Sequence, residues 1–297
     1  MCFVPRRHNS AFQNLTDTSN SCKLLSSSFV VMSKECLEMS CAKNGLVLAV
    51  LLSLASAGLA QTADELVAKN IQAKGGLEKM KAIQSVRMSG TQDNDGFKAA
   101  VAQENKRPNL VRETFALQGM TSIQAYDGNA GWQVRPFGGR KDPELMGEED
   151  LRSMLLDADF DGPLVDYKEK GNKIESLGHD TVDGDDAYKL KVTLKNGDIL
   201  YYYLDPDTFL EIRKEGQLFL RGSVQEFVVN LGSYKPVNGV MFPFSTSSGP
   251  RGVDGLPNTT YDKIEVNVPL EEAKFAVPAT LKAAAKPDAP KGDATKN

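Results

Sequence analysis

Regular alternation of apolar and polar residues is the feature that most constrains the fold of this chain. The alternation is clear in residues 189–194, 225–231 and 264–268. It is typical of half-buried strands in antiparallel sheets. Asn196-Gly197 separates two such runs and is a strong hairpin signal, and weaker turn signals lie at Asp127-Gly128, Asp205-Pro206 and Asn238-Gly239. We therefore predict a mainly antiparallel β-domain of roughly ten or eleven strands, without the strand–helix rhythm of a parallel sheet.

A few helices are also predicted. Thr62 and Glu65 have the spacing of a capping box, and an apolar stripe follows in residues 63–71. Leu151, Met154, Leu155 and Ala158 have helical spacing. Acidic residues at 148–150 precede them, where the helix dipole favours negative charge. We predict a helix in each of these two segments.

The first 60 residues have the layout of a targeting segment. Residues 46–60 are apolar but shorter than the roughly 20 residues that a membrane-spanning helix needs. Lys43 precedes them and small residues end them, as in a secretory signal peptide. We predict a mis-called or extended N-terminus at 1–31 and a signal peptide at 32–60. A folded domain at 62–278 and a disordered Ala/Lys/Pro-rich tail at 279–297 follow.

Removal of the first 60 residues would exclude several functions. All four cysteines and His8 lie there, so the processed chain has no thiol and only one histidine, His179. Disulfides, cysteine catalysis and cysteine-ligated zinc are then excluded. The net charge, −4 for the whole chain, becomes more negative, which disfavours nucleic acid as a partner. No cysteine is left for lipidation, and we expect a soluble periplasmic monomer.

One acidic segment matches the start of a calcium loop. Asp157, Asp159 and Asp161 are spaced two apart and precede a glycine, as in D-x-D-x-D-G. The twelfth position, where a calcium loop has glutamate, is Lys168. Two interpretations stay open: a weak calcium site, or solvated aspartates at a helix end.

Motifs for catalysis and cofactor binding are missing from the sequence. It contains no P-loop, no dinucleotide fingerprint and no G-x-S-x-G nucleophile motif. His179 lies beside Asp180 next to a turn, which is typical of a surface histidine. We expect no catalytic residues, no cofactor and no resident metal.

Some strands are apolar on both faces, most clearly residues 199–204. A sheet with one solvated face does not need such strands. Three explanations fit: a helix covers the second face, the sheet curls around an apolar cavity, or the residues form an ordinary core.

Short motifs in a fixed order give the chain a family resemblance. They are Arg107-Pro108-Asn109-Leu110, Asp127-Gly128 and Gly131-Trp132 followed by Pro136, then residues 159–205, 234–243 and 264–270. Together they resemble the LolA family of periplasmic lipoprotein carriers and the broader group of outer-membrane lipoprotein-sorting proteins. The resemblance covers most of residues 62–278.

The resemblance implies an incomplete, half-open β-barrel with a helical lid and an apolar cavity for acyl chains. The lid would be the helix with Leu151, Met154 and Leu155, whose apolar stripe fills the empty cavity. Arg107 matches the position that latches the closed form to helix backbone. The cavity-lining residues would be Phe115, Leu117, Trp132, Phe137, Leu151, Met154, Leu155, Tyr201, Tyr203 and Phe242.

The implied function is a carrier of lipoproteins or other lipids toward the outer membrane. Its partners would be that cargo and membrane-associated donor and acceptor proteins. A periplasmic sensor or regulatory module on the same fold is the alternative. An enzyme is a third, weaker reading, because the processed chain lacks thiols and has a single histidine.

Overall fold

The computed structural model describes residues 61–220 and 223–284 of the chain. The signal peptide predicted at 32–60, the segment before it and the tail from residue 285 lie outside the described residues. No helix in the described part is long and apolar enough to cross a membrane.

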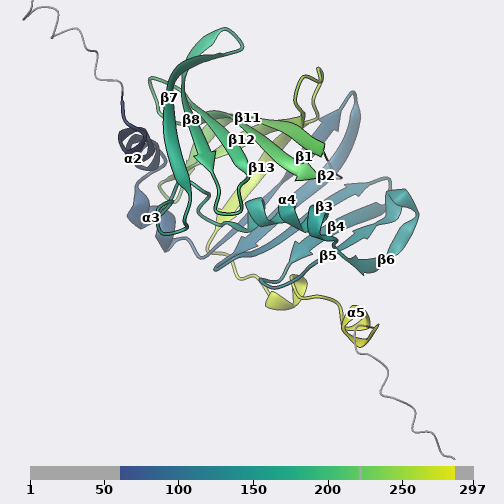
Figure 1. Ribbon diagram of the computed structural model, residues 1–297. Coiled ribbons are helices and arrows are strands. Elements are labelled where there is room, and N and C mark those ends of the chain that lie inside the picture. Colours follow the sequence, from purple (N-terminus) through teal and green to yellow (C-terminus); the bar gives the residue numbers. More distant parts are fainter. Residues whose placement is uncertain (1–60, 221–222, 285–297) are drawn as a thin grey trace, which may run out of the picture. The chain divides into compact units, whose positions relative to one another are not determined.

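A single antiparallel sheet of 13 strands dominates the described chain (Figure 1). The strand order is β6-β5-β4-β3-β2-β1-β13-β12-β11-β10-β9-β8-β7. Strands β6 and β7 are its two free edges, so the sheet does not close. The strands are β1 (Ser85–Asn94), β2 (Phe97–Lys106), β3 (Leu110–Leu117), β4 (Met120–Tyr126), β5 (Gly131–Arg135), β6 (Arg140–Leu145), β7 (Lys173–Val182), β8 (Asp185–Thr193), β9 (Ile199–Leu204), β10 (Glu211–Leu220), β11 (Ser223–Val237), β12 (Val240–Pro250) and β13 (Asn258–Val266).

This topology confirms the predicted fold class, a mainly antiparallel, half-open barrel with few helices. Most strands pair with their neighbours in sequence, and only the β1–β13 pair joins distant parts of the chain. The predicted turns Asp127-Gly128, Asn196-Gly197 and Asn238-Gly239 all connect adjacent strands. At Asn238-Gly239 both residues have positive φ, 50° and 77°, as a two-residue type I′ hairpin turn requires.

The predicted N-terminal helix is α2 (Ala63–Ala73). Its capping box forms as expected: the Glu65 amide donates to Thr62 Oγ1 at 3.3 Å, and the Thr62 amide donates to Glu65 Oε2 at 2.9 Å. After α2 the chain bends into the short helix α3 (Leu77–Ala82). The bend needs glycine at position 75, because φ is 117° there and a Cβ would lie 2.2 Å from the Gly239 carbonyl oxygen.

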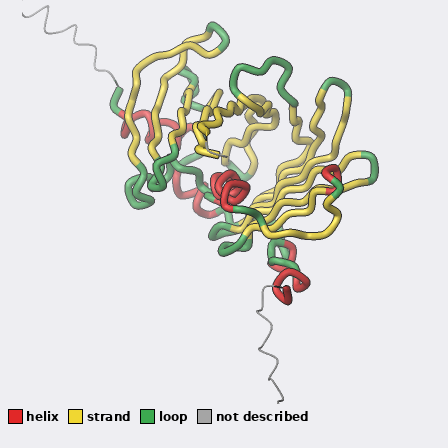
Figure 2. Tube along the Cα trace, turned by 45° about the vertical axis from the view of Figure 1, so that its right-hand side comes forward, coloured by secondary structure: helices red, strands yellow, loops and turns green. Residues whose placement is uncertain are grey.

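Helix α4 (Glu148–Ala158) follows β6 and precedes β7, so it connects the two free edges of the sheet. Figures 1 and 2 both place α4 inside the curve of the strands. Two short 3-10 helices, η1 (Pro136–Gly138) and η2 (Glu272–Lys274), complete the described segments together with α5 (Ala279–Ala284). Helix α5 corrects the prediction of disorder from residue 279, since Leu281 packs against the Trp132 cluster.

The core lies on the inner face of the sheet and beneath the N-terminal helices. Leu66 and Val67 of α2 pack with the β8–β9 residues Leu190, Val192 and Tyr202. A second cluster joins α3 to strands β1, β12 and β13, and comprises Met80, Ile83, Val86, Val165, Val240 and Ile264. Helices α2 and α3 therefore cover one end of the curved sheet.

Candidate functional site

A cavity of about 1470 Å³ lies between α4 and the inner face of the sheet. It is larger than the roughly 300–1,000 Å³ of ordinary small-molecule pockets. Residues from α3, α4 and most strands line it, so it is the interior of the half-open barrel. Its apolar lining includes Met80, Ile83, Val86, Met88, Val101, Phe115, Leu155, Leu156, Phe160, Leu200, Leu218, Phe227, Val229, Leu231, Val240 and Phe242.

The predicted lining residues divide into two groups. Phe115, Leu155 and Phe242 line the cavity, whereas the other seven do not. Leu117 is the last residue of β3 and lies beyond the cavity. Phe137 lies in η1 and contacts the Phe115 ring edge-on, with centroids 5.7 Å apart and its own side chain 45% exposed.

The tyrosines of β9 correct the prediction most clearly. Tyr202 lines the cavity, and its neighbours Tyr201 and Tyr203 point to the opposite face because side chains alternate along a strand. Tyr203 donates from its hydroxyl to Glu215 at 3.1 Å, and Lys189 lies over both outer rings. The sequence analysis predicts Tyr201 and Tyr203 as cavity-lining residues, but the tyrosine that lines the cavity is Tyr202.

Trp132 also lies on the outer face. Its indole Nε1 donates to the Phe275 carbonyl at 2.8 Å, and its ring packs with Ala125 and Val277. The C-terminal segment therefore covers this tryptophan, and its predicted place in the cavity is wrong.

Helix α4 lies over the cavity with its apolar stripe turned toward the sheet. Met154 is 3% exposed and packs with Val111 and Tyr126, and Leu151 joins the same cluster. The expectation that this stripe fills the cavity is therefore wrong for Leu151 and Met154. Leu155, 42% exposed, faces the cavity instead.

Arg107, directly after β2, connects the segment that follows α4 to α3. Its guanidinium donates to both carboxylate oxygens of Asp161, at 2.6 and 2.7 Å. It also donates to the backbone carbonyls of Ile83 at 2.7 Å and Met80 at 3.3 Å. The guanidinium lies over the Phe160 ring, 4.4 Å from its centroid. Arg107 thus joins the segment after α4 to the end of α3.

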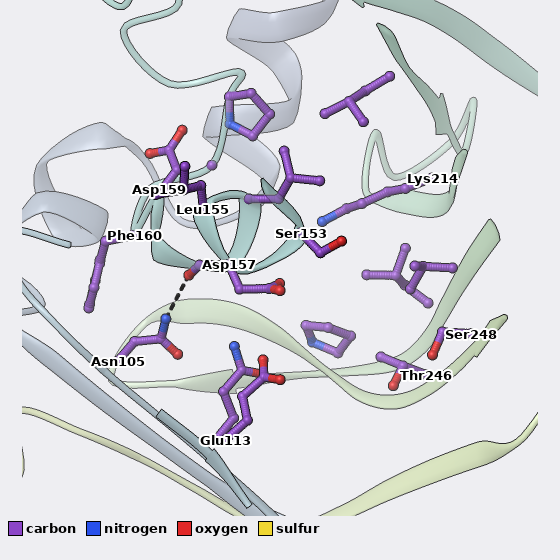
Figure 3. A pocket seen from close by; sticks show the side chains of 18 of the residues that line it. Asn105, Glu113, Ser153, Leu155, Asp157, Asp159, Phe160, Lys214, Thr246 and Ser248 are labelled. Carbon is purple, nitrogen blue, oxygen red and sulfur yellow. Dashed lines mark hydrogen bonds between the residues drawn. The ribbon is translucent and has the colours of Figure 1, made fainter. Parts of the chain in front are cut away.

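Further polar contacts join α4 to both arms of the sheet, which are strands β1–β6 and strands β7–β13. Asn105 of β2 donates to the Asp157 carbonyl at 2.8 Å (Figure 3). On the other arm, Arg152 forms an ion pair at 3.3 Å with the buried Asp198, in the β8–β9 turn. The helix is therefore held across the opening between the two arms.

The three aspartates of the calcium-like segment do not converge. Asp161 pairs with Arg107, and Asp159 pairs with Lys170 at 2.5 Å. Asp157 points from α4 into the cavity (Figure 3). Within the described residues, no group of three or more acidic or histidine side chains is arranged to hold a metal ion.

A buried charge cluster lies at one side of the cavity. Glu211, 4% exposed, pairs with Lys214 at 3.0 Å and with Lys74 at 3.1 Å. Burial alone would raise the pKa of Glu211, but the two lysines outweigh it and lower this pKa to about 2. Sequence reasoning missed this cluster, because Lys74 lies 137 residues before Glu211 in the chain.

Two further carboxyl groups line the cavity: Glu113, which sequence reasoning missed, and Asp157, which it named only as a weak calcium ligand. Burial raises the pKa of Glu113 to about 8, and the Asp157 charge raises it as well. Burial also raises the pKa of Asp157 to about 6, with Lys214 acting in the opposite direction. One feature of the sequence indicates that Glu113 faces inward. It occupies the same alternate positions along β3 as the apolar residues Val111 and Phe115, so all three side chains lie on the same face of the strand.

His179 lies away from the cavity. It is on β7, half exposed, with Nδ1 2.8 Å from Asp186 and its ring against Tyr188. This position fits the interpretation of a surface histidine.

Comparison with known proteins gives similarity at the level of structure. No protein-family model and no curated protein matches the sequence. A LolA superfamily protein from Nitrosomonas europaea has a similar structure, with a TM-score of 0.50 at 12% identity over 73% of this chain and 99% of its own. A DUF1329 family protein from Desulfovibrio piger gives a TM-score of 0.48 at 13% identity over 72% and 97%. A domain from Vibrio parahaemolyticus named for outer membrane lipoprotein sorting gives 0.45 at 11% identity over 70% and 97%.

The Nitrosomonas structure is matched over nearly its whole length. The described chain therefore has a LolA-like fold.

Proposed function

We propose that this protein is a periplasmic carrier that binds acyl chains of lipoproteins or other lipids and transfers them toward the outer membrane. The observation that carries the proposal is the cavity of about 1470 Å³ beneath α4. Burial of acyl chains needs no chemistry, since each CH₂ that leaves water contributes ~0.8 kcal/mol. A chain of a dozen carbons would supply roughly 10 kcal/mol, enough to offset displacement of a lid.

Helix α4 is the proposed lid, and Arg107 is the proposed latch. The contacts of Arg107 with Asp161 and with the α3 carbonyls support this role, because all of them involve segments next to α4 or α3. In the proposed cycle, cargo displaces α4 and the re-formed contacts favour release. The donor and acceptor would be membrane-associated proteins, and the carrier would act as a monomer.

Binding rather than catalysis is proposed because the cavity, not a set of reactive side chains, is the main feature of the interior. His179 is half exposed on a hairpin outside this cavity, which fits a surface role.

Native mass spectrometry tests this proposal. The protein is purified without detergent from the periplasm of a diderm host, and bound molecules are extracted and identified. We expect one acyl-bearing lipid or acylated protein per chain. An empty protein that stays empty after incubation with membranes would contradict the carrier function and favour a sensor or regulatory role.

A pair of variants on one strand localises the binding. Val229 of β11 lines the cavity, so Val229→Trp should fill part of it and reduce loading. Val224, on the same strand, is 59% exposed and outside the lining, so Val224→Trp should load normally. Equal loading of the two variants would place the lipid elsewhere.

A further inference from the structure

A row of polar side chains crosses the inner face of the sheet beneath α4. Gln103 of β2 is paired in register with Glu113 of β3, which is paired with Gln124 of β4. All three line the cavity. Among the described residues, none of these three side chains forms a hydrogen bond with another residue. A cavity for acyl chains alone has no need of such a row, because polar groups without partners oppose burial of an apolar ligand.

A second carboxyl group faces this row from α4. Asp157 points from the helix toward Glu113, and its own backbone is fixed by the bond from Asn105 (Figure 3). Both carboxyl groups line the cavity: Glu113 is half-buried in its wall, and Asp157 is exposed on the cavity side of α4. A negative charge on either carboxyl group makes ionisation of the other less favourable, because like charges repel.

The two lysines of the buried charge cluster are already paired with Glu211. Lys214 of β10 is the cation whose charge acts on Asp157, but it pairs with Glu211 and lies over the Tyr202 ring. Lys74 pairs with the same Glu211. The remaining titratable groups that act on the two carboxyls are hydroxyls, Tyr202 of β9 and Tyr261 of β13. Neither of these two lysines is therefore bonded to the carboxyl pair.

We propose that Glu113 and Asp157 form a subsite for the protonated primary amine of an amphiphile whose apolar part occupies the cavity. An ammonium group has three donors and a full positive charge, so it can bond both carboxyl groups at once, and its charge favours their ionised forms against the effect of burial. The amide oxygens of Gln103 and Gln124 lie in the same row and can accept from the remaining donor. This inference rests on the proposed function, and it names the head-group chemistry that the cavity selects.

The test uses three ligands with the same twelve-carbon chain and different heads: dodecylamine, dodecanol and dodecanoate. Each is titrated into the purified protein by calorimetry, below its micelle concentration, near neutral pH. We expect dodecylamine to bind at least about tenfold more tightly than dodecanol, because only the amine gains the ionic contacts.

Isosteric variants assign the preference to the two carboxyls. In Glu113→Gln/Asp157→Asn, the advantage of dodecylamine over dodecanol should fall below about threefold, with dodecanol affinity unchanged. Glu148→Gln is the matched control: Glu148 is on the same helix, exposed and outside the lining, so this variant should keep the full preference. A thermal melt of each variant verifies that it is folded.

The possible results separate the two proposals. Dodecanol binding with no preference for the amine would overturn the subsite and leave the carrier function standing. A preference that survives in the double variant would also overturn it. Tightest binding of dodecanoate would contradict it and assign head-group selection to Lys214. If no ligand binds, the carrier function itself fails, together with the subsite.

Discussion

Arg107 and Asp161 form a two-point ion pair, with nitrogen–oxygen distances of 2.6 and 2.7 Å. Both side chains are largely buried, at 22% and 14% exposure. The pair joins the end of β2 to the segment that follows α4, and the same guanidinium reaches the α3 carbonyl of Met80. Because partly buried, two-point pairs are stronger than surface pairs, this contact is well placed to stabilise the closed position of α4.

Loss of the Arg107 contacts should therefore slow cargo release. Arg107→Leu removes charge-assisted hydrogen bonds worth ~1.5–3 kcal/mol each from the closed form, which shifts the lid toward the open, loaded form. We expect the fold to persist, slower transfer of a fluorescent lipid to vesicles, and faster hydrogen exchange in residues 148–158.

A control for this variant is Arg213→Leu. Arg213 also pairs with an aspartate, Asp183, but it lies outside the cavity and away from α4. Its loss should leave lipid transfer unchanged. Wild-type transfer and exchange in Arg107→Leu would remove the latch role.

Substitutions at two neighbouring residues of α4 should affect different properties, namely stability at Met154 and lipid loading at Leu155. Met154 is 3% exposed beneath the helix, so Met154→Ala should lower the free energy of unfolding by ~2–5 kcal/mol. Leu155 is 42% exposed toward the cavity, so Leu155→Asp should change the unfolding free energy much less. It should nevertheless reduce lipid loading, because an acyl chain cannot be buried against an unpaired carboxylate without cost.

Urea unfolding and a loading assay on both variants measure this difference. If Leu155→Asp unfolds as easily as Met154→Ala, the cavity-facing position of Leu155 is wrong. If Leu155→Asp is stable and loads normally, the cavity beneath α4 does not hold the cargo.

Stability should fall on both sides of a maximum at about pH 5. The pKa of Glu113 is raised to about 8 in the folded protein, so the folded state binds more protons than the unfolded state above the ordinary range of a glutamate. Stability therefore decreases as the pH rises toward 8. The pKa of Glu211 is lowered to about 2, so its contribution is present at neutral pH and is lost as the pH falls toward 2.

Thermal melts across this pH range measure both effects. Glu113→Gln should flatten the alkaline slope, with little change near pH 5, where the wild-type carboxyl is protonated. An unchanged alkaline slope in this variant would show that Glu113 is not the group responsible.

The sequence predicted local structure better than it predicted which side chains face inward. Capping by Thr62 and Glu65 and the turn at Asn238-Gly239 depend only on residues close in the chain, and both form as expected. Residues 199–204 are different, because an apolar strand does not reveal which of its faces is inner. The inward choice of Tyr202 over its neighbours comes from packing with α2.

The candidate site shows the same limit. The family resemblance predicts Arg107 as a latch, but its partner Asp161 is 54 residues away, and the sequence offers Asp161 only as a weak calcium ligand or a solvated aspartate. Only the closure of α4 over the sheet brings the two together. Glu113 and Asp157 also face each other only because α4 lies over the sheet, and no spacing in the sequence predicts that they do.

Trp132, the single tryptophan of the chain, provides a last prediction because it faces away from the cavity. Its indole bonds to the Phe275 carbonyl, so its fluorescence should report docking of the C-terminal segment and not lipid binding. Phe275 is 0% exposed, so Phe275→Ala should shift the emission to longer wavelength and destabilise the fold by ~3–5 kcal/mol. Phe97→Ala, at a 66% exposed position, is the control and should change neither quantity. A large emission shift when lipid alone is added would instead place Trp132 beside the cargo, against the outer position that its bond to Phe275 gives it.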